Sequence, residues 1–146
     1  MIGGSKPNLF GGDANIVQLK LLKDYKLIGE NSKNPFLKLI NPAFRNKDGY
    51  IIYYSPTCPH CVNFAPTVSK LAKQLKGKMS VGTVDCTDTI NKNNILGDFF
   101  SISGFPTIKF YDSSSQEYID YSGGRNINDL LDFVCRVKNV CGPLKK

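Results

Sequence analysis

Two cysteines, Cys58 and Cys61, are separated by two residues at a point where a short apolar run gives way to a helical pattern. Residues 50–54 before them are aromatic or β-branched, a composition that favours a β-strand. A C-x-x-C pair between a strand and a helix is typical of thiol–disulfide redox chemistry. The pair therefore predicts a fold that combines a sheet with helices. The helix is indicated by apolar residues that recur at the three- and four-residue steps of one buried face, namely Cys61, Ala65, Val68, Leu71, Ala72 and Leu75.

The residues between and beside the cysteines indicate how the pair works. Pro59 suits the first helical position, because that position needs no N–H donor and the φ of proline is already helical. Cys58 is then expected at the helix N-cap or its neighbour, where free amides and the helix dipole stabilise a thiolate. Cys61 is expected about one turn inside the helix, shielded from solvent. His60, the only histidine of the chain, adds positive charge beside Cys58 when it is protonated.

These features predict a division of labour within the pair. Sites of this kind lower the cysteine pKa to roughly 3.5–7.5. We therefore expect Cys58 to attack as the thiolate and Cys61 to resolve the mixed disulfide. Pro59 and His60 are expected to tune the reduction potential toward an oxidising value.

Several segments spread over residues 50–138 resemble the thioredoxin superfamily, and most closely the catalytic domains of protein disulfide isomerases. The resemblance implies an α/β thioredoxin fold, with a central mixed β-sheet of four to five strands flanked by helices. It implies a thiol–disulfide oxidoreductase of the oxidase or isomerase type, acting on protein cysteines without a cofactor. The matching segments occur in the family's order and are residues 54–61, Pro66, and residues 84–87, 104–111 and 121–125.

The resemblance also implies a substrate-binding role for residues far from the cysteine pair. Family members carry a cis-proline packed against the active disulfide, and the matching bond here is Phe105–Pro106. The backbone of Phe105 is then expected to hydrogen-bond an extended substrate. Thr57, which stands where the family has an aromatic residue, is expected to contact the substrate as well. The structural alternative is a Pro106 that merely begins an edge strand.

One departure from the family bears on the mechanism. Disulfide isomerases and thioredoxins carry a buried acid six residues before the first cysteine, where this chain has Ile52, and its lysine partner has no match in residues 81–84. The absence of both members leaves no unpaired buried charge. We expect the Cys61 proton to leave through water or another group, so that the mixed disulfide resolves slowly. Two alternatives therefore stay open: a thioredoxin-like reductase, and a low-turnover peptide-binding or assembly module.

Length and composition are those of one small domain. A chain of 146 residues with 41% hydrophobic content can bury a sizeable core. We expect a flexible arm over residues 1–14, a single domain over 15–141 and a tail over 142–146. Further strands are predicted over residues 16–22, 79–85, 107–111 and 117–121, a short helix over 34–44, and a last helix over 126–137.

Three further cysteines lie outside the pair. Cys86 follows a predicted strand and is expected to be a small buried hydrophobe. Cys135 and Cys141 are predicted to form either a structural staple or a second redox pair that passes electrons between Cys58/Cys61 and a partner. Two unrelated free thiols are the alternative.

Other classes of function are disfavoured by the sequence. A zinc site would need two more ligands near the C-x-x-C, and the only histidine lies between its cysteines, so no metal is expected. The net charge of +7 comes mostly from dispersed lysines and does not by itself indicate nucleic-acid binding. The chain has no apolar stretch of membrane-helix length. Its oligomeric state is left open.

Location and partners are expectations from composition. Residues 1–20 hold no apolar block of the signal-peptide type, which favours an intracellular, cytoplasmic protein. The abundance of Lys, Asn and Ile suits A/T-rich coding sequence and hints at a large DNA virus, with packaging into the virion as one destination. The expected partners are cysteine-containing client proteins and a sulfhydryl oxidase or reductase that resets the pair.

Overall fold

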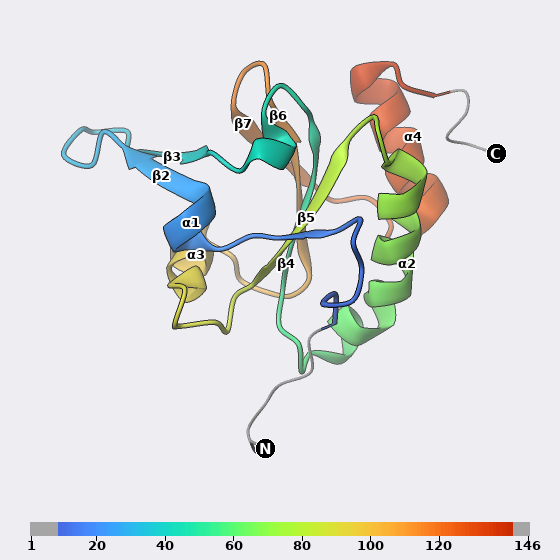
Figure 1. Ribbon diagram of the computed structural model, residues 1–146, viewed down its shortest axis with the longest axis horizontal. Helices are drawn as coiled ribbons and strands as arrows, with labels where there is room; N and C mark the ends of the chain where they lie inside the picture. Colours follow the sequence, from blue (N-terminus) through green and yellow to red (C-terminus); the bar gives the residue numbers. More distant parts are fainter. Residues whose placement is uncertain (1–8, 142–146) are drawn as a thin grey trace.

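The computed structural model describes residues 9–141 and contains a five-stranded mixed β-sheet (Figure 1). In spatial order its strands are β1 (Val17–Gln18), β5 (Ser80–Asp85), β4 (Gly49–Tyr54), β6 (Thr107–Asp112) and β7 (Glu117–Tyr121). β1 and β4 run parallel to β5, whereas β6 is antiparallel to both β4 and β7. The expected mixed sheet of four to five strands is confirmed.

Helices cover both faces of this sheet (Figure 1). One face carries α2 (Pro59–Leu75) and α4 (Ile127–Lys138); the other carries α1 (Leu21–Asp24), η1 (Pro42–Phe44) and α3 (Asn93–Phe99). The central strand β4 is buried along its whole length, because successive side chains enter the two cores alternately. Ile52 packs beneath α2 and α4, and Ile51 packs on the opposite face. Within residues 9–141, no helix is long and apolar enough to cross a lipid bilayer.

The strongly patterned segments lie where the sequence predicts them. The strands expected over residues 79–85, 107–111 and 117–121 and the helix expected over 126–137 are confirmed to within one residue at either end. Pro66 lies inside α2, as the resemblance implies.

The helix expected over residues 34–44 is wrong. The first part of this segment is β3 (Phe36–Leu39), which pairs with β2 (Tyr25–Ile28) in a separate two-stranded antiparallel sheet. Leu37 and Leu39 are buried and the residue between them is exposed, which is the two-residue period of a strand. Pro42 then begins η1. The apolar residues of this segment thus belong to two elements, β3 and η1, and their combined spacing resembles that of one helix face.

The strand expected over residues 16–22 is much shorter than predicted. Only Val17–Gln18 pairs with β5, because the chain turns into α1 within the predicted span. The turn is held by Asp24, whose buried carboxylate accepts a hydrogen bond from the Lys20 amide at 2.8 Å. α3 was not predicted, since its seven residues carry little apolar periodicity.

The expected arm, residues 1–14, and the expected tail, residues 142–146, lie at the two ends of the chain. Residues 1–8 and 142–146 lie outside the described residues. Phe10, inside the expected arm, is only 2% exposed, and its ring stands edge-on to that of Tyr54 at 5.0 Å. This part of the predicted arm therefore belongs to the packed core, because an aromatic side chain next to Tyr54 removes a large apolar area from water.

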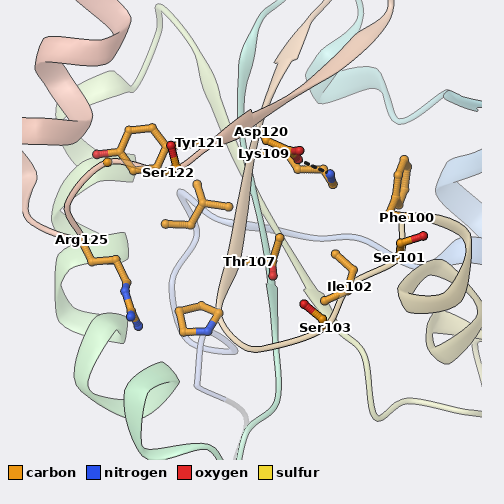
Figure 2. A pocket seen from close by; sticks show the side chains of 13 residues that line it. Phe100, Ser101, Ile102, Ser103, Thr107, Lys109, Asp120, Tyr121, Ser122 and Arg125 are labelled. Carbon is orange, nitrogen blue, oxygen red and sulfur yellow. Dashed lines mark hydrogen bonds and ion pairs between the residues drawn. The ribbon is translucent and has the colours of Figure 1, made fainter.

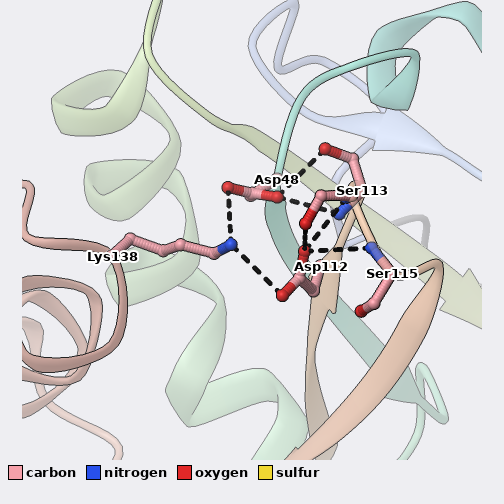
Figure 3. Close-up of polar contacts among 6 residues, drawn as sticks. Asp48, Asp112, Ser113, Ser115 and Lys138 are labelled. Carbon is pink, nitrogen blue, oxygen red and sulfur yellow. Dashed lines mark hydrogen bonds and ion pairs between the residues drawn. The ribbon is translucent and has the colours of Figure 1, made fainter.

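Ion pairs hold the C-terminal end of α4 against the end of the sheet that is remote from the cysteine pair (Figures 1 and 3). The Lys138 ammonium lies 3.5 Å from a carboxylate oxygen of Asp48 and 3.2 Å from one of Asp112. A hydrogen bond from the Ser114 hydroxyl, together with Lys138, lowers the pKa of Asp112 to about 2. These contacts tie α4 to the start of β4 and the end of β6.

Candidate active site

Cys58 is the N-cap of α2, as the sequence predicts. Its φ of −76° and ψ of 124° are extended, and Pro59 occupies the first turn. The Cys58 carbonyl accepts the amides of Cys61 and Val62, both at 3.0 Å, which begins the helix. The partly exposed Cys58 thiol therefore lies among the amides of a 17-residue helix.

The environment of Cys58 favours its thiolate. Hydrogen bonding from the Cys61 amide is the largest influence that lowers the pKa of Cys58, and the His60 amide acts in the same direction. Partial desolvation opposes these contacts, but the net shift is downward. Since the thiolate is the nucleophilic form, Cys58 is the more reactive cysteine of the pair.

Cys61 has the opposite character. It is 1% exposed, and burial raises its pKa to about 11. The two thiols are both free in this structure and lie one helical turn apart. The pair thus combines an accessible group that ionises easily with a shielded group that keeps its proton, which is the asymmetry expected of an attacking and a resolving cysteine.

The loop before β6 completes the site. The Phe105–Pro106 peptide bond is cis, and the Cys58 Sγ lies 3.6 Å from the Phe105 carbonyl oxygen. The alternative of a proline that begins an edge strand is wrong, because β6 lies between β4 and β7. Thr57 is exposed beside Cys58, with its hydroxyl 3.3 Å from that of Ser55. Phe105 therefore lies beside the Cys58 thiol, with Pro106 next to it in the chain, and Thr57 directly precedes Cys58. The substrate-binding role of these residues stays a prediction.

Among the described residues, no charged side chain lies beneath the pair in place of the family's acid and lysine. Ile52 is 1% exposed and pairs across β4 and β5 with Thr83, which is equally buried. Both lie on the face of the sheet that carries Cys61. The Thr83 hydroxyl has no hydrogen-bond partner among the described residues. Proton removal from Cys61 therefore has no built-in carboxylate at this position.

Arg125 belongs to the site although the sequence pattern assigns it no role. It lies in the loop between β7 and α4, and its positive charge lowers the pKa of both Cys58 and Cys61 as a minor contribution. The only sequence signal for it is its place in the resembling segment 121–125. Local spacing does not show that this loop folds back toward the start of α2.

The remaining cysteines lie apart from this chemistry. Cys86 is 8% exposed, as expected of a small buried hydrophobe, and burial raises its pKa to about 12. Cys135 and Cys141 form a disulfide with Cα atoms 4.5 Å apart. This disulfide lies at the α4 end that Lys138 ties to the start of β4, whereas Cys58 follows the end of β4. The six residues of β4 span about 20 Å, so the two pairs cannot exchange directly within one molecule.

Across residues 9–141, no three or more His, Cys, Asp or Glu side chains are grouped so that they could hold a metal ion. His60 is exposed on the first turn of α2. The arrangement around Cys58 therefore offers thiol chemistry rather than a metal-ligand set.

Comparisons with known proteins agree with the geometry. Protein disulfide-isomerase erp38 of Neurospora crassa is 35% identical over 117 residues, which are 78% of this chain and 29% of that protein. The first thioredoxin domain of mouse protein disulfide-isomerase A4 has a TM-score of 0.51 at 30% identity, over 64% of this chain and 63% of that one. The J-Trx1 fragment of ERdj5 shares the fold, with a TM-score of 0.66 at 22% identity over 90% of this chain and 56% of that one.

The match to the family itself covers most of the chain. Curated relatives are much longer, since the chain spans 29% of the Neurospora protein and 32% of protein disulfide-isomerase tigA of Aspergillus niger. The thioredoxin family model matches residues 28–136, which hold the cysteine pair, the cis-proline loop and Arg125. The chain belongs to the thioredoxin family.

Proposed function

We propose that this chain is a thiol–disulfide oxidoreductase of the disulfide oxidase or isomerase type, acting on cysteines of client proteins. In the oxidising direction, a client thiolate attacks the Cys58 sulfur of the Cys58–Cys61 disulfide. The bond between the two sulfurs of the pair breaks, and Cys61 leaves as a thiolate that takes up a proton. A second client thiolate then attacks the client sulfur bound to Cys58. The client leaves with a disulfide, and Cys58 leaves as a thiolate.

One observation carries the proposal. The Cys58 thiol is accessible, has a lowered pKa and lies 3.6 Å from the Phe105 carbonyl, whereas Cys61 is buried behind it with a pKa of about 11. An attacking client or partner therefore meets only one sulfur of the pair. The Phe105 carbonyl accepts the Cys58 thiol in this structure, and it can accept an amide from an extended client backbone once that sulfur is bonded to the client.

The same asymmetry favours the oxidising direction. Stabilising the Cys58 thiolate stabilises the reduced pair, and a pair with a stable reduced form is a strong oxidant. Continued oxidation of clients then needs a partner that returns electrons from Cys58 and Cys61 to an acceptor. A sulfhydryl oxidase is the partner class that fits this direction, and a reductase fits the reverse one.

Two assays test the proposal. Refolding of reduced ribonuclease measures oxidation, refolding of scrambled ribonuclease measures isomerisation, and reduction of insulin measures the reverse reaction. We expect the chain to accelerate refolding, and Cys58→Ser to abolish the acceleration. Cys86→Ala is the matched control, since it removes a free thiol that is not part of the pair. Equal activity of Cys58→Ser and the unsubstituted chain would contradict the proposal.

A second candidate, a peptide-binding module with little turnover, is favoured by Ile52. Without an acid at this position, the Cys61 thiol with its pKa of about 11 loses its proton slowly. This candidate predicts stoichiometric mixed disulfide at Cys58 and no more than one turnover per chain. Many turnovers that disappear in Cys58→Ser would exclude it.

A further inference from the structure

A groove of about 370 Å³ runs beside β6 from the cis-proline loop toward the edge of the sheet (Figure 2). Its walls come from the segment after α3, from β6 and β7, and from the loop before α4. Its lining includes Phe100, Pro106, Lys109, Asp120 and Arg125. Serine and threonine hydroxyls supply much of the remaining lining, so the groove is polar.

The groove opens next to the reactive thiol. Pro106 lines it, and the preceding residue, Phe105, places its carbonyl 3.6 Å from the Cys58 Sγ. Arg125 lines the same groove and is close enough for its charge to lower the pKa of Cys58. A client whose sulfur is bonded to Cys58 therefore has its neighbouring residues at the mouth of the groove.

The two ends of the groove differ in charge. At the end near the edge of the sheet, the Lys109 ammonium lies 2.5 Å from a carboxylate oxygen of Asp120 and 5.4 Å from the centre of the Phe100 ring. Lys109 is thus compensated by a carboxylate, and this end is close to neutral. Figure 2 shows this pair well separated from the Arg125 guanidinium.

At the mouth, Arg125 has no such compensation. Its side chain is exposed, and it forms no salt bridge with any residue between 9 and 141. Asp129, four residues later, instead accepts one hydrogen bond from the Asn126 side-chain amide and donates its own backbone amide to the Asn126 side-chain oxygen. One positive charge therefore faces the position where a client enters. A guanidinium can bind a carboxylate with two parallel hydrogen bonds, so the matching client group is an acidic side chain.

We propose that this groove selects client segments that carry an acidic side chain close to the reactive cysteine, and that Arg125 binds that carboxylate. The inference rests on the proposed function, because it concerns the client of the same cysteine pair. Rim charges act mainly on association, so the selection appears in the rate of mixed-disulfide formation.

The test uses short peptides whose single cysteine is disulfide-bonded to thionitrobenzoate. The Cys58 thiolate attacks the peptide sulfur, a Cys58–peptide disulfide forms, and coloured thionitrobenzoate leaves with the electron pair of the broken bond. The chain carries Cys61→Ser so that the product is trapped, and its mass identifies the peptide adduct. Three peptides differ only in having Glu, Gln or Lys two residues from the cysteine, and each rate is divided by that of the same peptide with 2-mercaptoethanol.

We expect the Glu peptide to react about 2- to 5-fold faster than the Gln peptide, and the Lys peptide to be slower than both. In Arg125→Gln the Glu-to-Gln ratio falls to about 1, and in Arg125→Glu it inverts. These ratios are taken within one variant, so a general change in Cys58 reactivity cancels. The preference also weakens as salt rises, because the interaction is screened.

Arg136→Gln is the matched control. It removes the same charge from α4 at a position whose guanidinium lies 5.8 Å from the Phe133 ring and does not line this groove. The ratio of the Glu-peptide rate to the Gln-peptide rate should be the same in this variant as in the chain with Arg136 unchanged. A ratio near 1 with Arg125 present, or a preference that survives Arg125→Gln, overturns the inference while leaving the proposed function intact. Failure of every peptide to release thionitrobenzoate overturns the proposed function itself.

Discussion

Cys58 and Cys61 are the same residue type in one helical turn, yet their surroundings separate their acidities. The Cys58 thiolate accepts backbone amides at the helix N-terminus, so its pKa is lowered. Cys61 points into the core, where burial raises its pKa to about 11. The charged form is therefore favoured at one sulfur and disfavoured at the other. This difference follows from the helix N-terminus at Cys58 and from burial at Cys61, and it needs no charged residue under the site.

Alkylation measures this difference directly. Because the Cys58 pKa lies below that of an ordinary thiol, its thiolate persists to a lower pH than that of a free cysteine, whereas the buried Cys61 stays protonated. We expect iodoacetamide at pH 6–7 to modify Cys58 well before Cys61 in the reduced chain. Peptide mapping after timed quenching gives both rates. Equal rates at the two positions, or faster modification of Cys61, would refute the assigned roles.

Among the secondary-structure elements, β4 and β5 decide which groups lie beneath the cysteine pair. Their parallel register places Ile52 beside Thr83, both fully buried on the α2 side. Successive side chains of a strand point to opposite faces. A substitution at Ile52 therefore changes the surroundings of Cys61, whereas a substitution at the adjacent Ile51 does not.

Ile52→Glu should raise the rate at which the mixed disulfide resolves. A carboxylate beneath Cys61 supplies a general base, and we expect a gain of up to about 100-fold. The same change buries a charge and should lower the free energy of unfolding by about 3–5 kcal/mol, part of which Thr83→Lys restores. Stopped-flow kinetics of mixed-disulfide decay and urea unfolding measure the two effects.

Ile51→Glu is the control for that substitution. Ile51 is as deeply buried in β4 but packs in the core on the opposite face. The Ile51→Glu variant should lose a similar amount of free energy of unfolding, but its mixed disulfide should resolve no faster than that of the unsubstituted chain. Faster resolution in both variants would show that loosened packing, rather than proton transfer, limits the step.

α4 is held at its C-terminal end by the Cys135–Cys141 disulfide and by Lys138. Because this end is remote from Cys58, we expect the disulfide to act as a staple rather than as a relay within the molecule. Replacing both cysteines by Ala should lower the free energy of unfolding by about 2 kcal/mol, the loop-closure value for so short a loop. Urea unfolding measures the loss. Retained stability together with lost oxidoreductase activity would instead support the shuttle.

Over the entire chain, the parts that could be predicted are those with a local signal. The start of α2 is indicated by three features that lie close together in the sequence: the C-x-x-C, the proline after its first cysteine and the helical spacing beyond it. The cis-proline loop and the last strands were predictable because their segments resemble the family. Each of these features depends on residues close together in sequence.

The features that escaped prediction depend on contacts between distant segments. Phe10 is buried because it packs into the core that contains Tyr54, although its neighbours in the chain are rich in glycine. β3 pairs with β2 across a loop, so its apolar residues were attributed to a helix. Arg125 gained a place in the site because the loop after β7 returns to the start of α2. Sequence spacing alone carries none of this information.

The oxidising character of the pair is the claim on which the proposed function depends most. Equilibration with glutathione, followed by alkylation and mass analysis, gives the reduction potential of Cys58 and Cys61. A helix N-cap that stabilises the Cys58 thiolate predicts a value between about −120 and −180 mV, the range of disulfide oxidases and isomerases. A value near about −270 mV would make the chain a thioredoxin-like reductant and contradict the account.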